Sequence, residues 1–182
     1  MKALKTFTIA YASLADGEHF FDYQIDSKFL THFEAALVQE AALEVQLHLS
    51  KFLGSLELNF KVAGTVQTPC DICSEEFSLP IEGAEQILVK IVPEIPLEQD
   101  EYNVVYIQES MHSINIAEML YELIMLSIPM RKVHSEDENG HPTCDPSVLQ
   151  YLQKDQDVPD DNDEGDDDDN INPIWDELKK LK

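Results

Sequence analysis

Residues 43–62, LEVQLHLSKFLGSLELNFKV, decide the fold. Apolar and polar residues alternate through both halves of this stretch. Successive side chains of a strand point to opposite faces, so the alternation predicts two strands with one buried and one solvent-exposed face. The short break at Phe52-Leu53-Gly54-Ser55 interrupts the pattern and contains a glycine. It predicts a hairpin turn that joins the two strands.

The same kind of pattern extends to both sides of this hairpin. Phe21, Tyr23 and Ile25 alternate with polar residues and predict an earlier strand. Further strands are expected at 77–81, 86–92 and 103–107, the last two separated by a loop with two prolines. The domain is therefore expected to be mainly antiparallel β-structure.

The clearest predicted helix spans about Asn115 to Ser127. Asn115 and Glu118 have the spacing of a capping box, and Pro129 ends the helix. Apolar residues cover this helix except for one narrow polar stripe, so we expect it to be buried against the sheet. A shorter helix is expected after Asp26, whose side chain can cap it. The expected fold class is α+β, with a curved antiparallel β-sheet packed around one buried helix.

The composition is strongly acidic, with 36 Asp and Glu against 12 Lys and Arg in 182 residues and a formal net charge of −24. Proteins that bind nucleic acid through their surface field need clustered Lys and Arg. A broad RNA-binding face is therefore disfavoured, although a small local contact stays open. A basic protein partner suits this charge better.

The chain is expected to have three parts. Residues 1–152 would form one α+β domain, which is an ordinary domain size. Residues 153–170 contain few apolar residues, and ten of the residues between Asp155 and Asp169 are acidic, so we expect an acidic disordered linker. Residues 171–182 would form a short C-terminal docking helix with Asn172 as its N-cap and with Trp175 and Leu178 on its apolar edge.

No apolar run is long enough for a signal peptide or a membrane span, so we expect a cytoplasmic protein without a membrane partner. The chain has three cysteines, an odd number that argues against a secreted disulfide framework. The thiols are therefore expected to be reduced or bound to metal.

Cys70-Asp71-Ile72-Cys73 is the motif with the most chemical content. Such a pair can chelate a metal ion from a tight turn, or cycle between dithiol and disulfide. It lies between two strand patterns, a setting typical of a zinc knuckle. A closed tetrahedral site needs two more ligands. His134 and Cys144 can supply them from the loop after the helix, with His141 as the alternative histidine. A structural zinc ion is the cofactor we expect.

Two other interpretations of the cysteines remain open. They could have only a structural role, or Cys70 and Cys73 could serve a thiol–disulfide oxidoreductase, although no positive helix end is predicted beside them. No nucleophile elbow, P-loop or dinucleotide fingerprint occurs, so we expect neither a small-molecule substrate nor an enzymatic activity.

Another possible function is that of a regulatory module whose acidic tail mimics nucleic acid.

The order of these motifs resembles the YceD family, which is named for accumulation of the large-subunit ribosomal RNA. The resemblance rests on the C-D-I-C knuckle at 70–73 with Phe77, on Ile128-Pro129-Met130-Arg131, on Cys144, and on N-P-I-W-D-E-L at 172–178. His134 stands where the family commonly has a cysteine, and the family's arginines at the positions of Ile72 and Ile174 are missing.

The resemblance implies a ribosome-assembly accessory role without catalysis. The chain would be an adaptor or chaperone for a basic ribosomal protein or a pre-ribosomal particle, and it would support production or stability of large-subunit ribosomal RNA. The residues expected to contact the partner are Arg131, Lys132, Trp175 and Leu178.

Overall fold

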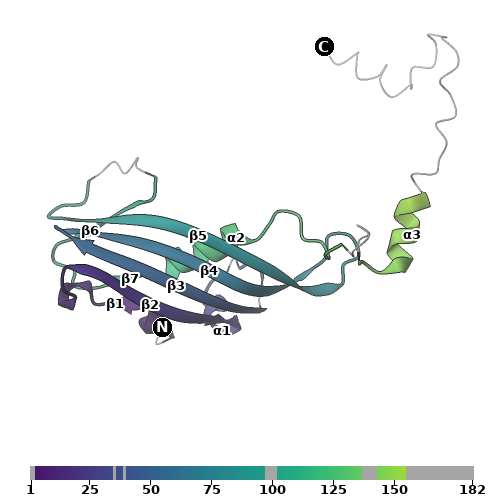
Figure 1. Cartoon of the computed structure of the whole chain (residues 1–182), viewed down its shortest axis with the longest axis horizontal. Helices are drawn as coiled ribbons and strands as arrows, with labels where there is room; N and C mark the ends of the chain where they lie inside the picture. Colours follow the sequence, from purple (N-terminus) through teal and green to yellow (C-terminus); the bar gives the residue numbers. More distant parts are fainter. Residues whose placement is uncertain (1–2, 35, 39, 97–101, 137–142, 155–182) are drawn as a thin grey trace, which may run out of the picture. The chain divides into compact units, whose positions relative to one another are not determined.

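The computed structural model describes residues 3–34, 36–38, 40–96, 102–136 and 143–154. The chain divides into two compact units, Met1–Cys144 and Asp145–Lys182, and each is described here by itself. The first unit is α+β, with a mostly antiparallel sheet and few helices (Figure 1).

The main sheet has five strands in the order β2-β3-β4-β5-β6. Their bounds are Gly17–Asp26 (β2), Glu40–Phe52 (β3), Ser55–Pro69 (β4), Glu76–Val92 (β5) and Val104–Gln108 (β6). The first four strands pair antiparallel. β6 instead runs parallel to β5, with Leu88 opposite Val104. The sheet is therefore mainly antiparallel, as expected, and among the described strands the expectation of antiparallel pairing fails only for β6.

The β3–β4 hairpin confirms the prediction made from residues 43–62. Phe52 lies opposite Ser55, so the turn contains only Leu53 and Gly54. Their φ angles are +40° and +80°, the positive values that a two-residue turn needs to match the twist of its strands. Leu43, Val45, Leu47 and Leu49 point into the core from β3, and Leu56, Leu58, Phe60 and Val62 do so from β4.

β5 corrects the expectation of two strands at 77–81 and 86–92, because it is one continuous strand. The alternation is lost at Gly83, which pairs with Val62 in the middle of the strand. A Cβ atom built on Gly83 would lie 2.0 Å from the Ser127 hydroxyl oxygen. The glycine therefore reflects a close approach of the following helix, and it does not mark the end of a strand.

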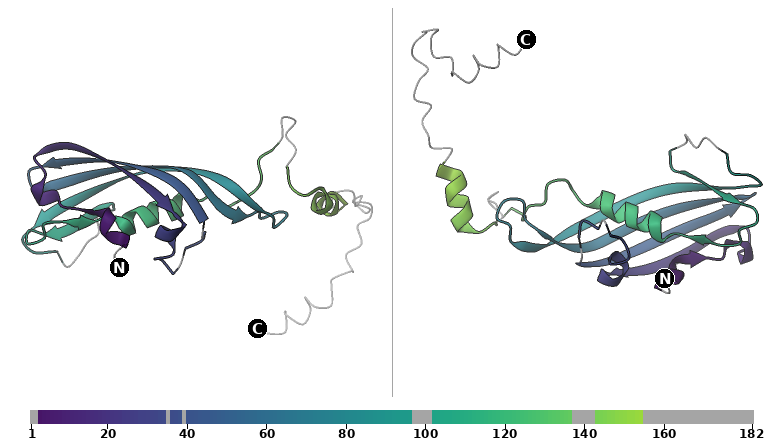
Figure 2. Two further views of the ribbon diagram at one scale, coloured as in Figure 1. Left: turned by 90° about the horizontal axis from the view of Figure 1, so that it is seen from below. Right: turned by 180° about the vertical axis from the view of Figure 1, so that it is seen from behind.

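That helix, α2, spans Ala117–Ser127. It begins two residues after the expected start, because Asn115 belongs to the short strand β7 (Ile114–Asn115) and accepts the Ala117 N–H through its side chain at 2.9 Å. Leu120, Leu123 and Ile124 are buried, and the sheet curves over this side of the helix (Figure 2). The opposite side reaches the surface, where Leu126 is 76% exposed.

Smaller elements complete the first unit. Asp26 accepts hydrogen bonds from the N–H groups of Lys28 and Phe29 and caps α1 (Ser27–Leu30), which confirms the predicted short helix. The other small elements are η1 (Ala3–Phe7), β1 (Thr8–Ile9), which pairs with β7, and η2 (Tyr11–Ser13).

The second unit contains α3 (Pro146–Lys154), a helix that the sequence patterns did not predict. Asp145 accepts the Ser147 N–H at 2.8 Å at its start. The first two residues of the expected linker, 153 and 154, are therefore helical. The rest of that linker and the predicted helix at 171–182 lie outside the described residues. Among the residues described, no helix has both the length and the apolar character that crossing a bilayer requires.

Candidate metal centre

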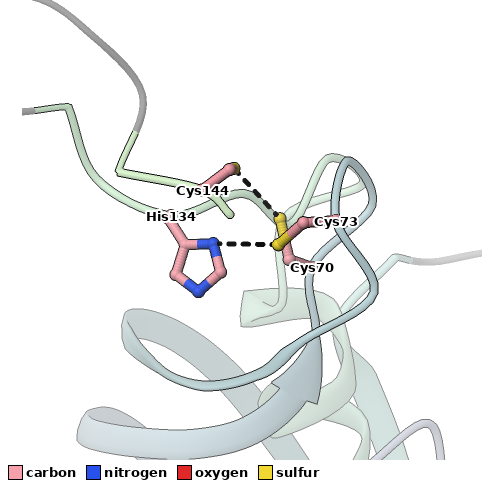
Figure 3. A group of neighbouring side chains, drawn as sticks. All are labelled: Cys70, Cys73, His134 and Cys144. Carbon is pink, nitrogen blue, oxygen red and sulfur yellow. Dashed lines mark hydrogen bonds between the residues drawn. The ribbon is translucent and has the colours of Figure 1, made fainter. Parts of the chain in front are cut away.

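Four side chains from distant parts of the sequence meet at one end of the sheet (Figure 3). Cys70 and Cys73 lie in the turn between β4 and β5, His134 lies in the chain after α2, and Cys144 ends the first unit. Their ligand atoms all lie within 4.8 Å of one another. The sequence prediction grouped these same four residues.

The separations between the donor atoms suit a tetrahedral ion. The Sγ atoms of Cys70 and Cys144 are 3.7 Å apart, and the Cys73 Sγ atom is 3.5 Å from the His134 Nδ1 atom. Zinc bonds of about 2.3 Å to sulfur and about 2.0 Å to nitrogen place tetrahedral ligand atoms roughly 3.8 Å (S–S) and roughly 3.5 Å (S–N) apart. A donor set of three thiols and one imidazole is typical of structural zinc sites.

The β4–β5 turn holds its two cysteines through backbone hydrogen bonds. The Cys70 N–H donates to the Glu75 carbonyl, and the Ser74 N–H donates to the Cys70 carbonyl, both at 2.9 Å. Ser74 has a φ of +61°, the left-handed conformation that reverses the chain there. The Ile72 N–H points back to the Cys70 sulfur at 3.4 Å. The turn therefore directs both thiols and one N–H dipole to the same place.

This environment separates the acidities of the two buried thiols. Burial raises the pKa of Cys70, but hydrogen bonds from the backbone of Cys73, Ile72 and His134 and from the Cys144 thiol outweigh burial and lower it to about 6. Burial raises the pKa of Cys144 to about 11, and the neighbouring Cys70 and Cys73 sulfurs act in the same direction. Cys70 is thus prepared as a thiolate, the form that binds metal.

Asp71 joins the turn to the chain that carries His134. Its N–H donates to the Lys132 carbonyl at 2.7 Å, and its carboxylate accepts the Lys132 N–H at 2.6 Å. The Lys132 ammonium also lies 3.8 Å from the same carboxylate. Phe77, at the start of β5, packs on the His134 ring with the centroids 4.5 Å apart. Sequence reasoning missed both contacts, because nothing in the motif indicates partners so distant in the sequence, 61 positions away for Asp71.

The protein comparisons bear on the same region. Residues 58–182 match the family described as "Large ribosomal RNA subunit accumulation protein YceD". The chain belongs to the YceD family. The match runs from β4 through the metal centre to the C-terminus, so it contains all four candidate ligands. Searches of curated proteins and of solved structures found no match.

The other predicted site residues of this YceD-family chain are placed less fully. Arg131 is exposed, and Lys132 is half-buried in the contact with Asp71. The structure thus gives Lys132 a role inside the chain that the sequence did not suggest. His141, Trp175 and Leu178 lie outside the described residues. The partner-binding role of Arg131, Lys132, Trp175 and Leu178 stays a prediction.

Proposed function

We propose that this chain is a non-enzymatic adaptor or chaperone for a basic ribosomal partner, and that Cys70, Cys73, His134 and Cys144 hold a structural zinc ion. Membership of the YceD family implies a role in accumulation of the large-subunit ribosomal RNA. The observation that carries the proposal is the convergence of three thiols and one imidazole within 4.8 Å. An assembly role of this kind would be exercised in the cytoplasm.

The position of the four donors favours a structural ion over a catalytic one. A catalytic zinc keeps a coordination position open, whereas four protein ligands close the tetrahedron. The bound ion would supply cross-links between the β4–β5 turn and the chain that follows α2. Because these two segments are distant in the sequence, binding of the ion would contribute to folding directly.

Burial of the thiols argues against an oxidoreductase. Thiol–disulfide exchange requires a thiolate that a substrate disulfide can reach. Cys70 is 2% exposed and Cys144 is 4% exposed, so only Cys73 is partly accessible. The lowered pKa of Cys70 therefore suits binding of a metal ion better than attack on a substrate disulfide. Efficient reduction of insulin by the purified chain, lost in Cys73→Ser, would favour the oxidoreductase.

The adaptor role takes its support from charge. A formal charge of −24 attracts basic proteins and repels the phosphate backbone of RNA. An acidic partner bound to a basic ribosomal protein would shield its charge from nonspecific contacts with RNA. If the acidic tail acted alone as a nucleic-acid mimic, the folded unit would add nothing to binding.

Metal content tests the zinc site. Chain purified without chelators should carry about one zinc per molecule by mass spectrometry, as four protein ligands require. Cys70→Ser should lose the metal and lower the midpoint of thermal unfolding. Glu76→Ala is the matched control, since this exposed residue follows the same turn and donates no ligand. If the unmodified chain purified without chelators holds no zinc and Cys70→Ser does not lower its melting temperature, the site is refuted.

Co-purification tests the adaptor role. Tagged chain isolated from cells should bring down ribosomal proteins or pre-ribosomal particles, identified together with their RNA. In cells without the chain, the ratio of large-subunit to small-subunit ribosomal RNA should be lower than in normal cells. Normal proportions of the two RNAs, together with no ribosomal protein in the isolate, would contradict the proposal.

A further inference from the structure

Within the described residues, one edge of the main sheet is open beside α2. β6 pairs only with Leu88–Val92 of β5, so it lies beside one end of that strand (Figure 1). The preceding part of β5, residues 76–87, pairs with β4 on one side. On its other side, no strand within the described ranges pairs with it. An open strand of this length presents backbone groups that another chain can pair with.

The direction of these backbone groups follows from the hydrogen bonds of Leu88. Its N–H donates to the Asn103 carbonyl at 2.9 Å, on the side of β6. Alternate residues of a strand turn their N–H and C=O groups to the same edge. Gln86, Ala84 and Glu82 therefore present theirs to the open side. Pro80 is next in this series and has no N–H, which is typical of edge strands and limits the pairing surface.

A groove of about 440 Å³ lies along this open segment. Residues 82–86 of β5 form one wall, and Leu123, Leu126 and Ser127 of α2 contribute to the lining together with Tyr102. Tyr102 is 86% exposed and Leu126 is 76% exposed. Large apolar side chains beside an unpaired edge offer contacts to the side chains of an added strand.

The groove is acidic, and no Lys or Arg is among the described residues that line it. Glu82 projects from one face of β5, and Glu85 from the face that packs against α2. Burial raises the pKa of Glu85, and repulsion from the nearby Glu122 of α2 raises it further. A cation placed between these carboxylates would relieve that repulsion. A second copy of this chain would bring a charge of −24 instead.

We propose that residues 82–86 receive an extended basic segment of a partner protein as an added strand, in line with β6. Its Lys or Arg side chains would lie beside Glu82 on one face and beside Glu85 and Glu122 on the other. This inference names the partner class for the adaptor role and so rests on the proposed function. It does not involve the metal centre.

A labelled peptide of three Lys-Lys-Val-Val repeats, which places Lys on both faces of an extended strand, tests the surface by fluorescence anisotropy when it is added to the full chain. Ala84→Pro removes one outward N–H, and the proline ring obstructs the approach of the added strand. The two effects together should weaken binding of the peptide about tenfold. Ala84→Val keeps the N–H and should bind like the unmodified chain. Unchanged zinc content and circular dichroism in both variants would show that the fold is intact.

Three results would overturn the proposal. Equal affinity of Ala84→Pro and Ala84→Val would exclude strand addition, and equal binding of a peptide of three Glu-Glu-Val-Val repeats would exclude selection by charge. Slow hydrogen exchange at the Glu82, Ala84 and Gln86 amides of the free chain would show that the edge is already covered. If the protection of these amides from exchange does not depend on protein concentration, a segment of the same chain covers the edge. If the protection rises with concentration, a second copy covers it.

Failure of this inference is distinguishable from failure of the adaptor role. If Ala84→Pro brings down the same ribosomal proteins as the unmodified chain, the edge is not the docking surface and the adaptor role stands. If the unmodified chain brings down none, the adaptor role itself fails, whatever the peptide does.

Discussion

The contact between Asp71 and Lys132 makes a prediction about metal affinity. Asp71→Ala removes the carboxylate that accepts the Lys132 N–H at 2.6 Å, while the backbone bond from the Asp71 N–H to the Lys132 carbonyl remains possible. His134 lies two residues beyond Lys132. Loss of the carboxylate should therefore free the segment that carries His134, so that binding a metal ion must order it again.

The magnitude follows from the exposure of the contact. A hydrogen bond to a charged group is worth roughly 1.5–3 kcal/mol, and the lower end applies because 41% of the Asp71 side chain is exposed. The ion pair with the Lys132 ammonium, at 3.8 Å, adds little at a surface. Since about 1.4 kcal/mol corresponds to a factor of ten, zinc affinity should fall by up to about tenfold.

Competition with a chromogenic chelator measures this affinity. Glu75→Ala is the matched control, because it removes one exposed carboxylate from the same turn while the Glu75 carbonyl still accepts the Cys70 N–H. The two variants thus change the charge near the metal equally, and only Asp71→Ala loses the contact with Lys132. If both hold zinc with the same affinity, Asp71 is not a positioning residue for His134 and the reasoning is refuted.

Three further predictions concern packing and the tail. Leu120→Ala should lower the free energy of unfolding by about 2–5 kcal/mol in urea titrations, because Leu120 is 0% exposed. Leu126 is 76% exposed, so Leu126→Ala should change the same quantity by less than about 0.5 kcal/mol. Similar losses in the two variants would contradict the packing of α2. Gly83→Ala should destabilise the fold by about 1–3 kcal/mol, and a second substitution, Ser127→Gly, should restore part of this loss because it removes the hydroxyl 2.0 Å from the new Cβ atom. If the effects of the two substitutions on the free energy of unfolding simply add in the double variant, the strain does not come from Ser127. Trp175→Ala should weaken association with the ribosomal partner and leave the melting temperature unchanged, and a large drop in melting temperature with unaltered association would assign Trp175 to the fold.

Much of the local structure was predictable because its causes are local. Alternation over residues 43–62 depends on which face of each strand meets solvent, and the Leu53-Gly54 turn depends on backbone preferences of those two residues. The cap at Asp26 needs only a side chain and the next few N–H groups. The four candidate ligands were predictable for a chemical reason: the sequence has only three cysteines, and His134 is one of two histidines near the third.

The rest depended on segments that are distant in sequence. β5 continues through Gly83 because the residues on both sides of it pair with β4, and Gly83 leaves room there for Ser127 of α2. The parallel pairing of β6 with β5 also joins separate segments. The contact of Asp71 with Lys132 likewise joins residues 61 positions apart. The sequence by itself determined the alternation of the β3–β4 hairpin, the capped first helix and the residue types of the candidate metal centre, since these depend on neighbouring residues and on composition. Only the tertiary structure decided where the four candidate ligands meet and which edge of the sheet stays open among the described residues, because those depend on how separate segments pack.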